Sequence, residues 1–403
     1  MDIQPILKAL RHQKTAALLI AFEIALACAI ICNATFLIVS RLERSQMLSG
    51  VAESELLRIR AASLDDDEDK MARIREDIAG LRGIPGVVSV TATQQVPFGQ
   101  SSWNSGVRTS PDQQNSVVNA TTYYDGADMV STFGLKLVAG RDFSPDEYYD
   151  FDEVASGAVT PSSIIITRTL ANRLWPGEPP LNQAIYMGGS DPLRVIGVVE
   201  TLVRPSIWDD STAHDCMIFP TRGTPGTQYV LRVQGADLDE VIESATAKLK
   251  ALQPNRIVRG AETFTELREE YFRQDRVMAV LLMTVIAALL VVTALGIVGL
   301  ASFWVQRRQR HIGIRRALGA TRGNILRYFQ LENFLIVSAG ILAGMFAAYG
   351  INAWLMQHYE LPRLPAYYLP IGALSLWLLG QLSVLHPALR ATRVPPAMAT
   401  RGG

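Results

Sequence analysis

The sequence predicts a membrane protein with four transmembrane α-helices and a large α+β extracytoplasmic domain inserted between helices one and two. Two observations predict this fold: four long apolar stretches and an uneven distribution of charge. Residues 41–276 contain 34 of the 38 acidic and 24 of the 38 basic residues, and the rest of the chain contains 4 acidic and 14 basic residues. These basic residues flank the apolar stretches, which is typical of cytoplasmic loops. The pattern therefore favours a membrane protein over a nucleic-acid-binding protein.

The charge and hydropathy patterns divide the chain into three parts. Residues 1–40 are predicted to hold a cytoplasmic N-terminal helix and the first span. Residues 41–276 are predicted to form the extracytoplasmic domain with stalk helices, and residues 277–403 to hold spans two to four with a short cytoplasmic helix.

Each span needs about 20 mostly apolar helical residues to cross a hydrocarbon core of roughly 30 Å. Four stretches meet this length: 16–39, 277–305, 334–356 and 366–385. We expect the first to be an uncleaved anchor, because its apolar run is longer than the roughly 7–15 residues of a signal-peptide core.

Basic residues predict the orientation of the spans. They gather before the first span, between spans two and three, and after the fourth span: Lys8, Arg11, Lys14; Arg307, Arg308, Arg310, Arg315, Arg316, Arg322, Arg327; Arg390, Arg393 and Arg401. The link between spans three and four has only Glu360 and Arg363. Because cytoplasmic loops are enriched in Lys and Arg, both termini and the 307–333 loop are predicted to be cytoplasmic and the 41–276 domain to lie outside.

The 41–276 domain shows alternating helix and strand patterns. A helix is expected to begin in the acidic segment 65–69 and to carry Met71, Ile74, Ile78 and Leu81 on one face. Further strands and helices are predicted at 87–93, 164–166, 170–174, 194–199, 230–233, 241–252 and 257–258. The irregular segment 99–160 is expected to form a second lobe. Segments 42–59 and 264–276 are predicted to continue spans one and two as helical stalks, with a loose linker as the alternative.

Few residues suggest chemistry. The sequence has no G-x-x-x-x-G-K-[ST] phosphate loop, so we expect no ATP binding of that kind. Its five histidines are scattered without the spacing of a metal site. His214, Asp215 and Cys216 are adjacent and are expected to form a surface turn rather than a metal site. We therefore predict no catalytic residue, no metal and no enzymatic activity of this chain.

The segment 307–321 between spans two and three is the most informative. It predicts a short basic helix that ends at a Gly319-Ala320 turn, followed by Thr321 as the N-cap of a helix into span three. Its small residues allow a partner to approach closely, and its arginines can pair with partner carboxylates. Positive-inside charge alone would account for the arginines, but not for the ordered Ile-Gly-Ile and Ala-Leu-Gly-Ala pattern.

Residues 312–321 resemble the cytoplasmic signature of the MacB and FtsX type permeases, which are ABC transporter subunits with a large periplasmic domain. Glu332 matches the acidic residue that opens their third span, and 387–397 is similar to their usual ending. Segments of the outer domain resemble the MacB periplasmic core domain: 85–87, 134–143, 174–177 and 195–199.

The resemblance implies a dimeric transmembrane unit driven by an ABC ATPase that binds the 307–320 helix. The ATPase-coupling residues it implies are Ile312, Gly313, Arg315, Arg316, Ala317, Leu318, Gly319, Ala320 and Glu332. MacB carries a fused N-terminal ATPase, whereas this chain begins with a short amphipathic segment, so a separate ATPase polypeptide is expected to bind the ATP and Mg. No cofactor is expected in this chain. His311 stands where the family often has Glu.

A carboxylate and two glycines within the predicted spans, and three tryptophans of the outer domain, each suggest a specific role. Glu23 lies inside the first span, where a charge costs roughly 2.5–3.5 kcal/mol; an interhelical hydrogen bond is favoured over a proton or substrate role. Gly340 and Gly344 form a G-x-x-x-G that permits close helix contact, within one subunit or across a dimer. Three tryptophans are expected at core or rim positions rather than against a cargo or adaptor: Trp103, Trp175 and Trp208.

The resemblance favours a permease of the bacterial inner membrane that exports a peptide, antibiotic or similar amphiphile. Its implied partners are an ABC ATPase, a second permease copy or sister permease, the lipid bilayer and, in a Gram-negative cell, a periplasmic adaptor and an outer-membrane channel. Alternatives with the same mechanics are LolC-like lipoprotein release and FtsX-like control of cell-wall hydrolases. A secondary transporter is disfavoured, because four spans are few and no inverted repeat is apparent.

Overall fold

The computed structural model describes residues 14–63, 70–224, 228–359 and 363–393. It divides into two compact units, Gln46–Gln274 and the combination of Met1–Ser45 with Asp275–Gly403. Several sequence predictions lie outside the described residues: Lys8, Arg11, the acidic segment 65–69, Glu360 and the tail 394–403.

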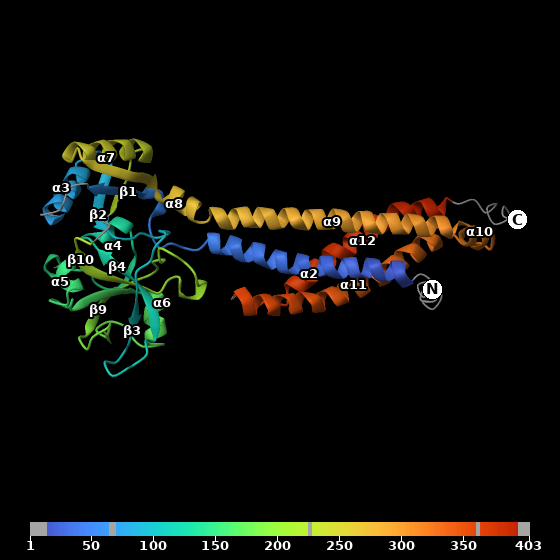
Figure 1. Cartoon of the computed structure of the whole chain (residues 1–403), viewed down its shortest axis with the longest axis horizontal. Coiled ribbons are helices and arrows are strands. Elements are labelled where there is room, and N and C mark those ends of the chain that lie inside the picture. The colour runs from blue at the N-terminus through green and yellow to red at the C-terminus, as the bar shows by residue number, and fades with distance from the viewer. Residues whose placement is uncertain (1–13, 64–69, 225–227, 360–362, 394–403) are drawn as a thin grey trace. The chain divides into compact units, whose positions relative to one another are not determined.

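Among the described residues, four helices are long and apolar enough to cross a membrane. They are α2 (Lys14–Ser45), α9 (Arg273–Arg307), α11 (Arg322–Tyr359) and α12 (Tyr368–Thr392). Each contains one predicted span, except that α12 begins two residues after the predicted start of the fourth. The α+β unit follows α2 and precedes α9 in the chain (Figure 1), which confirms the predicted fold class.

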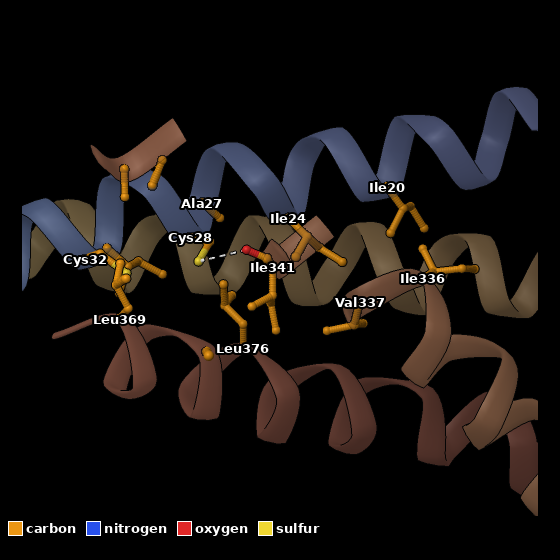
Figure 2. Packing of buried hydrophobic residues seen from close by; sticks show 14 of the residues in the cluster. Ile20, Ile24, Ala27, Cys28, Cys32, Ile336, Val337, Ile341, Leu369 and Leu376 are labelled. Atoms are coloured by element: carbon orange, nitrogen blue, oxygen red, sulfur yellow. Dashed lines mark hydrogen bonds between the residues drawn. The ribbon is translucent and has the colours of Figure 1, made fainter. Parts of the chain in front are cut away.

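The core of the helical unit lies where α2, α11 and α12 meet (Figure 2). Cys28 of α2 points toward Ile341 of α11, whose carbonyl lies 3.9 Å from the Cys28 Sγ. Leu376 of α12 belongs to the same cluster. Only 11% of the apolar window of α9 is buried, compared with 39%, 33% and 44% for α2, α11 and α12. The helix α9 is therefore the least enclosed of the four.

The predicted G-x-x-x-G of α11 packs against α2 of the same chain. A Cβ at Gly340 would lie 2.7 Å from the Ala21 carbonyl oxygen, and one at Gly344 would lie 2.6 Å from the Ala25 carbonyl oxygen. Only glycine permits these approaches, so these residues serve packing within one subunit.

The first lobe of the α+β unit is an antiparallel four-stranded sheet with the order β12-β1-β11-β2. The strands are β1 (Leu56–Ser63), β2 (Val87–Thr93), β11 (Gln228–Val233) and β12 (Arg256–Thr263). Helices α3 (Lys70–Arg82) and α7 (Leu238–Leu252) lie side by side on one face of this sheet (Figure 1). Asp77 of α3 accepts two hydrogen bonds from Arg256 of β12, each 2.8 Å long, and a third from Tyr229 of β11.

The second lobe contains an eight-stranded mixed sheet, whose main path has the order β3-β4-β10-β7-β9-β5. Its strands are β3 (Asn104–Val107), β4 (Val118–Asp125), β5 (Leu137–Gly140), β6 (Tyr149–Asp150), β7 (Ser163–Thr167), β8 (Ala184–Ile185), β9 (Leu193–Val199) and β10 (Cys216–Arg222). Short helices connect them: α4 (Met129–Phe133), α5 (Phe151–Ala155), α6 (Arg168–Leu174), and the 3-10 turns η2 (Pro145–Glu147) and η3 (Asp210–Thr212).

The structure corrects two expectations for this unit. Segment 42–59 is not a continuous stalk helix: α2 ends at Ser45, and the 3-10 turn η1 (Glu53–Glu55) leads directly into β1. The reason is that residues 56–59 form a strand that is buried on both faces: Leu57 and Ile59 pack in the cluster beneath α3 and α7, and Leu56 and Arg58 are buried on the opposite face. The second lobe is also larger than 99–160, because β7, β9 and β10 join the same sheet as β4.

The predicted helix at 264–276 is present in two pieces. Helix α8 (Phe264–Tyr271) and the start of α9 are separated at Phe272. Helix α8 begins with a capping box in which Thr263 and Glu266 exchange side-chain and main-chain hydrogen bonds.

Candidate functional site

The loop between α9 and α11 folds as predicted from the sequence. Helix α10 (Gln309–Ala317) is followed by a left-handed Gly319 with φ +95°. The Gly319 and Ala320 amides donate to the carbonyls of Arg316 and Arg315, at 3.1 and 3.0 Å, which is a Schellman C-cap. Thr321 Oγ1 then accepts the Asn324 amide at 3.3 Å and caps α11. We refer to residues 308–321 as the elbow.

Apolar packing holds the elbow against three membrane helices. Ile312 is buried in a cluster with residues from the ends of α9, α11 and α12: Val305, Ile325, Phe329, Ala388 and Ala391. Gly313 is also buried. These two predicted coupling residues therefore anchor α10 to the bundle and do not form its outer surface.

An ion pair at the start of the elbow links it to α11. Arg308 Nη1 donates to both carboxylate oxygens of Glu332, at 2.9 and 2.8 Å. Glu332 is only 1% exposed, and the Arg308 guanidinium lies 5.6 Å from the centre of the Trp304 ring. Arg315 lies over Tyr328 of α11, at 4.8 Å. Glu332 thus supports the elbow from the buried side of α11, and no sequence pattern indicated that Arg308 is its partner.

The outer surface of the elbow is apolar and basic. Leu318 is 83% exposed and Ile314 is 41% exposed, although apolar side chains of this size are usually buried. Most of the remaining predicted coupling residues are exposed or half-exposed beside them: Arg315, Arg316, Ala317, Gly319 and Ala320. His311 is exposed as well. Ile314 was absent from the predicted coupling residues. Its position two residues after Ile312, on the opposite side of α10, could have indicated that it faces outward.

A second arrangement, which the sequence did not suggest, joins the two chain segments at which the α+β unit begins and ends. Arg268 of α8 donates to Glu53 at 2.5 Å and to the Met47 carbonyl at 2.6 Å. Its guanidinium lies 5.0 Å from the ring centre of Phe98 and 5.8 Å from that of Phe272. We refer to Arg268, Glu53 and the Met47 carbonyl as the clasp.

Glu23 lies where α2 faces α9. A Cβ at Gly296 would lie 2.8 Å from Glu23 Oε2, so the missing side chain makes room for the carboxyl group. Thr293 supplies a side-chain hydrogen bond to Glu23, and Oε1 is buried without a partner in the described part of the chain. This arrangement agrees with an interhelical contact.

The expected surface turn at 214–216 is only partly correct, because His214 lies in a turn and is half-buried but the two residues after it are not at the surface. Asp215 and Cys216 are fully buried, because β10 begins at Cys216 in the interior of the second lobe. Burial raises the pKa of the Asp215 carboxyl, and Arg173, whose Nε lies 2.9 Å away, opposes that shift. No group of three His, Cys, Asp or Glu side chains in the described ranges is arranged to hold a metal ion.

The tryptophans of the α+β unit occupy different environments. Trp103 packs edge-on against Tyr124, with ring centres 5.5 Å apart, and Trp175 packs against a core cluster of the second lobe. Trp208 is more exposed, with the Arg204 guanidinium 4.8 Å from its ring. The structure therefore places the first two at core or rim positions.

Comparison with known proteins covers most of the chain. The MacB-like periplasmic core domain matches residues 24–249, and the FtsX-like permease C-terminal family matches residues 283–396. The uncharacterized ABC transporter permease YknZ of Bacillus subtilis (strain 168) is 26% identical over 335 residues, which is 81% of this chain and 78% of YknZ.

The macrolide export ATP-binding/permease protein MacB of Shewanella sp. (strain W3-18-1) is 26% identical over 342 residues, 81% of this chain and 48% of that protein. The chain thus spans about half the length of the MacB relative. The crystal structure of the periplasmic region of MacB from Actinobacillus actinomycetemcomitans is 16% identical and covers 57% of this chain and 97% of that chain, with a TM-score of 0.35. The MacB-like periplasmic core domain family alone matches more than half of the residues of this chain. The chain therefore belongs to the family of MacB-like ABC transporter permeases.

Proposed function

We propose that this permease couples ATP hydrolysis by a separate ABC ATPase to a conformational change of its α+β unit, for export of a peptide, antibiotic or similar amphiphile. One observation carries the proposal: the elbow is anchored to three membrane helices while Leu318, 83% exposed, projects from it. An exposed apolar side chain on a fixed support is suited to insertion into a partner's pocket.

The ATPase is the partner that fits this surface. Arg315 and Arg316 beside Leu318 can pair with carboxylates of a docked protein. The partner would bind ATP and Mg, and would lie in the cytoplasm, where the basic residues around the elbow and at the chain ends are expected. Arg315, Arg316, Ala317, Leu318, Gly319 and Ala320 are then contact residues, and Ile312, Gly313 and Glu332 transmit the contact inward.

The packing of the elbow supports transmission through the bundle. A tilt of α10 acts on α9, α11 and α12 together, because Ile312 belongs to one buried cluster with residues of all three helices and Glu332 fixes Arg308 to α11. Helix α9 has 35 residues and is about 52 Å long, more than the roughly 30 Å of a hydrocarbon core. It can therefore carry a displacement beyond the bilayer without a break.

The cargo and remaining partners follow from the relatives. Several are named as macrolide export proteins, which supports export of an amphiphile. A second copy or sister permease would complete the transmembrane unit, with a periplasmic adaptor and outer-membrane channel in a Gram-negative cell. These names do not favour the alternatives of lipoprotein release and control of cell-wall hydrolases.

The test is Leu318→Glu in the full chain, reconstituted with its ATPase in nanodiscs. We expect the permease-stimulated ATPase rate to fall about tenfold or more, because the substitution places a charge where the docked ATPase would bury an apolar side chain. Membrane insertion should be unchanged. The matched control is Leu48→Glu, since Leu48 is 75% exposed in the other unit. Normal stimulation by the Leu318→Glu protein would refute the role of the elbow.

A further inference from the structure

A cleft of about 530 Å³ separates α3 of the first lobe from the ends of β4 and β10 of the second lobe. Contacts between the lobes close both of its ends. Lys70 at the start of α3 donates to the Gly223 carbonyl, and Arg82 at its end pairs with Asp128 at 2.5 Å. The volume lies within the range of about 300–1,000 Å³ that is usual for small-molecule sites.

The floor of the cleft is a tight junction between the lobes. Thr91 Oγ1 donates to the Gly126 carbonyl at 2.8 Å. A Cβ at Gly126 would lie 1.9 Å from the Ala92 carbonyl oxygen, so only glycine fits there. The main-chain contact fixes the floor, and the cleft opens between α3 and the second lobe above it.

One wall of the cleft is apolar and adaptable. Met71 and Ile78 of α3 line it, two turns apart on the same helix. Opposite Met71, a Cβ at Gly223 (φ +74°) would lie 2.5 Å from the Met71 Sδ. Methionine is flexible and polarizable, which suits it to ligands of variable shape.

Two guanidinium groups line the same cleft. Arg75 Nε donates to the Met71 carbonyl at 3.2 Å, and Arg222 Nη2 donates to the Pro145 carbonyl at 3.4 Å. Neither forms an ion pair with a carboxylate in the described residues, whereas Arg82 is paired with Asp128. Asp128 and Asp150 also line the cleft, so among its described lining residues three arginines face two carboxylates.

We propose that this cleft binds an amphiphile with one carboxylate or phosphate group and an alkyl chain. Arg75 and Arg222 would hold the anionic group, because the planar guanidinium matches carboxylate and phosphate oxygens. The alkyl chain would lie along Met71 and Ile78. That this amphiphile is the exported cargo rests on the function proposed above, but its binding does not.

The test uses the full chain in nanodiscs and a dodecanoic acid that carries a photoreactive diazirine. After irradiation, peptide mass spectrometry maps the adducts. We expect adducts within residues 70–82 and 219–224, and about fivefold fewer with the matched diazirine dodecylamine. Unlabelled dodecyl phosphate should compete, and inorganic phosphate at the same concentration should not, because it lacks the alkyl chain.

Variants separate this site from nonspecific labelling. The double change Arg75→Gln and Arg222→Gln should reduce labelling of the cleft about fivefold or more. The matched control replaces two exposed arginines of the same lobes, Arg259→Gln and Arg194→Gln, and should label normally. Equal labelling by acid and amine, unchanged labelling of the double variant, or competition by inorganic phosphate would each overturn the proposal.

The same assay distinguishes this inference from the proposed function. The Leu318→Glu protein should bind the probe normally, because the cleft and the elbow belong to different units. Loss of cleft labelling by the Arg75→Gln and Arg222→Gln protein with intact ATPase stimulation would support both the binding site in the cleft and the coupling role of the elbow. Stimulation without any cleft labelling in the unaltered chain would refute the cleft alone.

Discussion

The elbow and the clasp both use an arginine to hold distant chain segments together, but in different surroundings. At the elbow, Arg308 pairs with Glu332, 24 residues later, and the two side chains are 16% and 1% exposed. At the clasp, Arg268 pairs with Glu53 across 215 residues, and both side chains are 21% exposed. The elbow pair is therefore the more deeply buried.

The neighbouring residues differ as well. Beside the elbow pair, Ile314 and Leu318 project into solvent. At the clasp, Phe98 and Phe272 enclose the guanidinium, and Met47 supplies a main-chain carbonyl. The difference indicates that the elbow is a fixed support for an exposed surface, whereas the clasp holds two segments of its own unit together. Variants at the two places should therefore fail in different ways.

The largest effect is expected for Glu332→Ala. It leaves Arg308 buried without its counter-charge, and breaking a buried pair in this way costs about 3–5 kcal/mol. Thermal unfolding in nanodiscs should show this loss of stability, together with loss of ATPase stimulation. The control is Glu270→Ala, because the Arg273–Glu270 pair is 70% and 58% exposed and should contribute less than about 1 kcal/mol. Equal losses in the two proteins would contradict the importance given to burial.

A smaller loss of stability, about 1–3 kcal/mol, is expected for Arg268→Ala, which removes charge-assisted hydrogen bonds from a partly exposed site. If the clasp acts after the elbow, this protein should keep ATPase stimulation and lose export. The control Arg268→Lys retains a charge near Glu53 but lacks the planar group that also reaches the Met47 carbonyl. Its stability should therefore lie between that of the unaltered chain and that of Arg268→Ala. Joint loss of stimulation and export, as expected for Leu318→Glu, would remove the distinction between the regions.

The parts of this structure that the sequence predicted depend on local patterns. Hydropathy and length indicated the four spans, and the β-branched residues of 87–93 indicated β2. The turn at Gly319 and the cap at Thr321 were also predictable, because each depends on a few neighbouring residues.

The parts that could not be predicted depend on contacts between distant residues. Nothing in the sequence joins Arg268 to Glu53, or Asp77 to Arg256 across 179 residues. The stalk expectation for 42–59 failed because β1 pairs with β11 and β12, which lie about 170–200 residues later in the chain. The exposure of Leu318 and the burial of Ile312 depend on which face of α10 packs against residues of α9, α11 and α12, and these residues are distant in the sequence.

The smallest effect is expected at a third arginine–carboxylate pair, in which the arginine is more exposed than at the elbow or the clasp. Arg141 is 54% exposed and donates to both oxygens of Glu147, at 2.6 and 2.9 Å. Its hydrogen bonds lower the pKa of Glu147 to about 2, below the unfolded value of about 4.3. The stabilisation is therefore fully present above pH 4.3 and is lost as the pH falls toward 2.

Solvent screening limits this contribution to about 0.5 kcal/mol. Denaturation of the unaltered chain and of Glu147→Gln at several pH values measures it, because the difference in stability between them should shrink as the pH falls from about 5 to about 2. A difference that stayed constant over this range would show that the ion pair contributes nothing. A loss as large as that of Glu332→Ala would show that burial does not rank the three pairs, and the contrast between elbow and clasp would then need another physical cause.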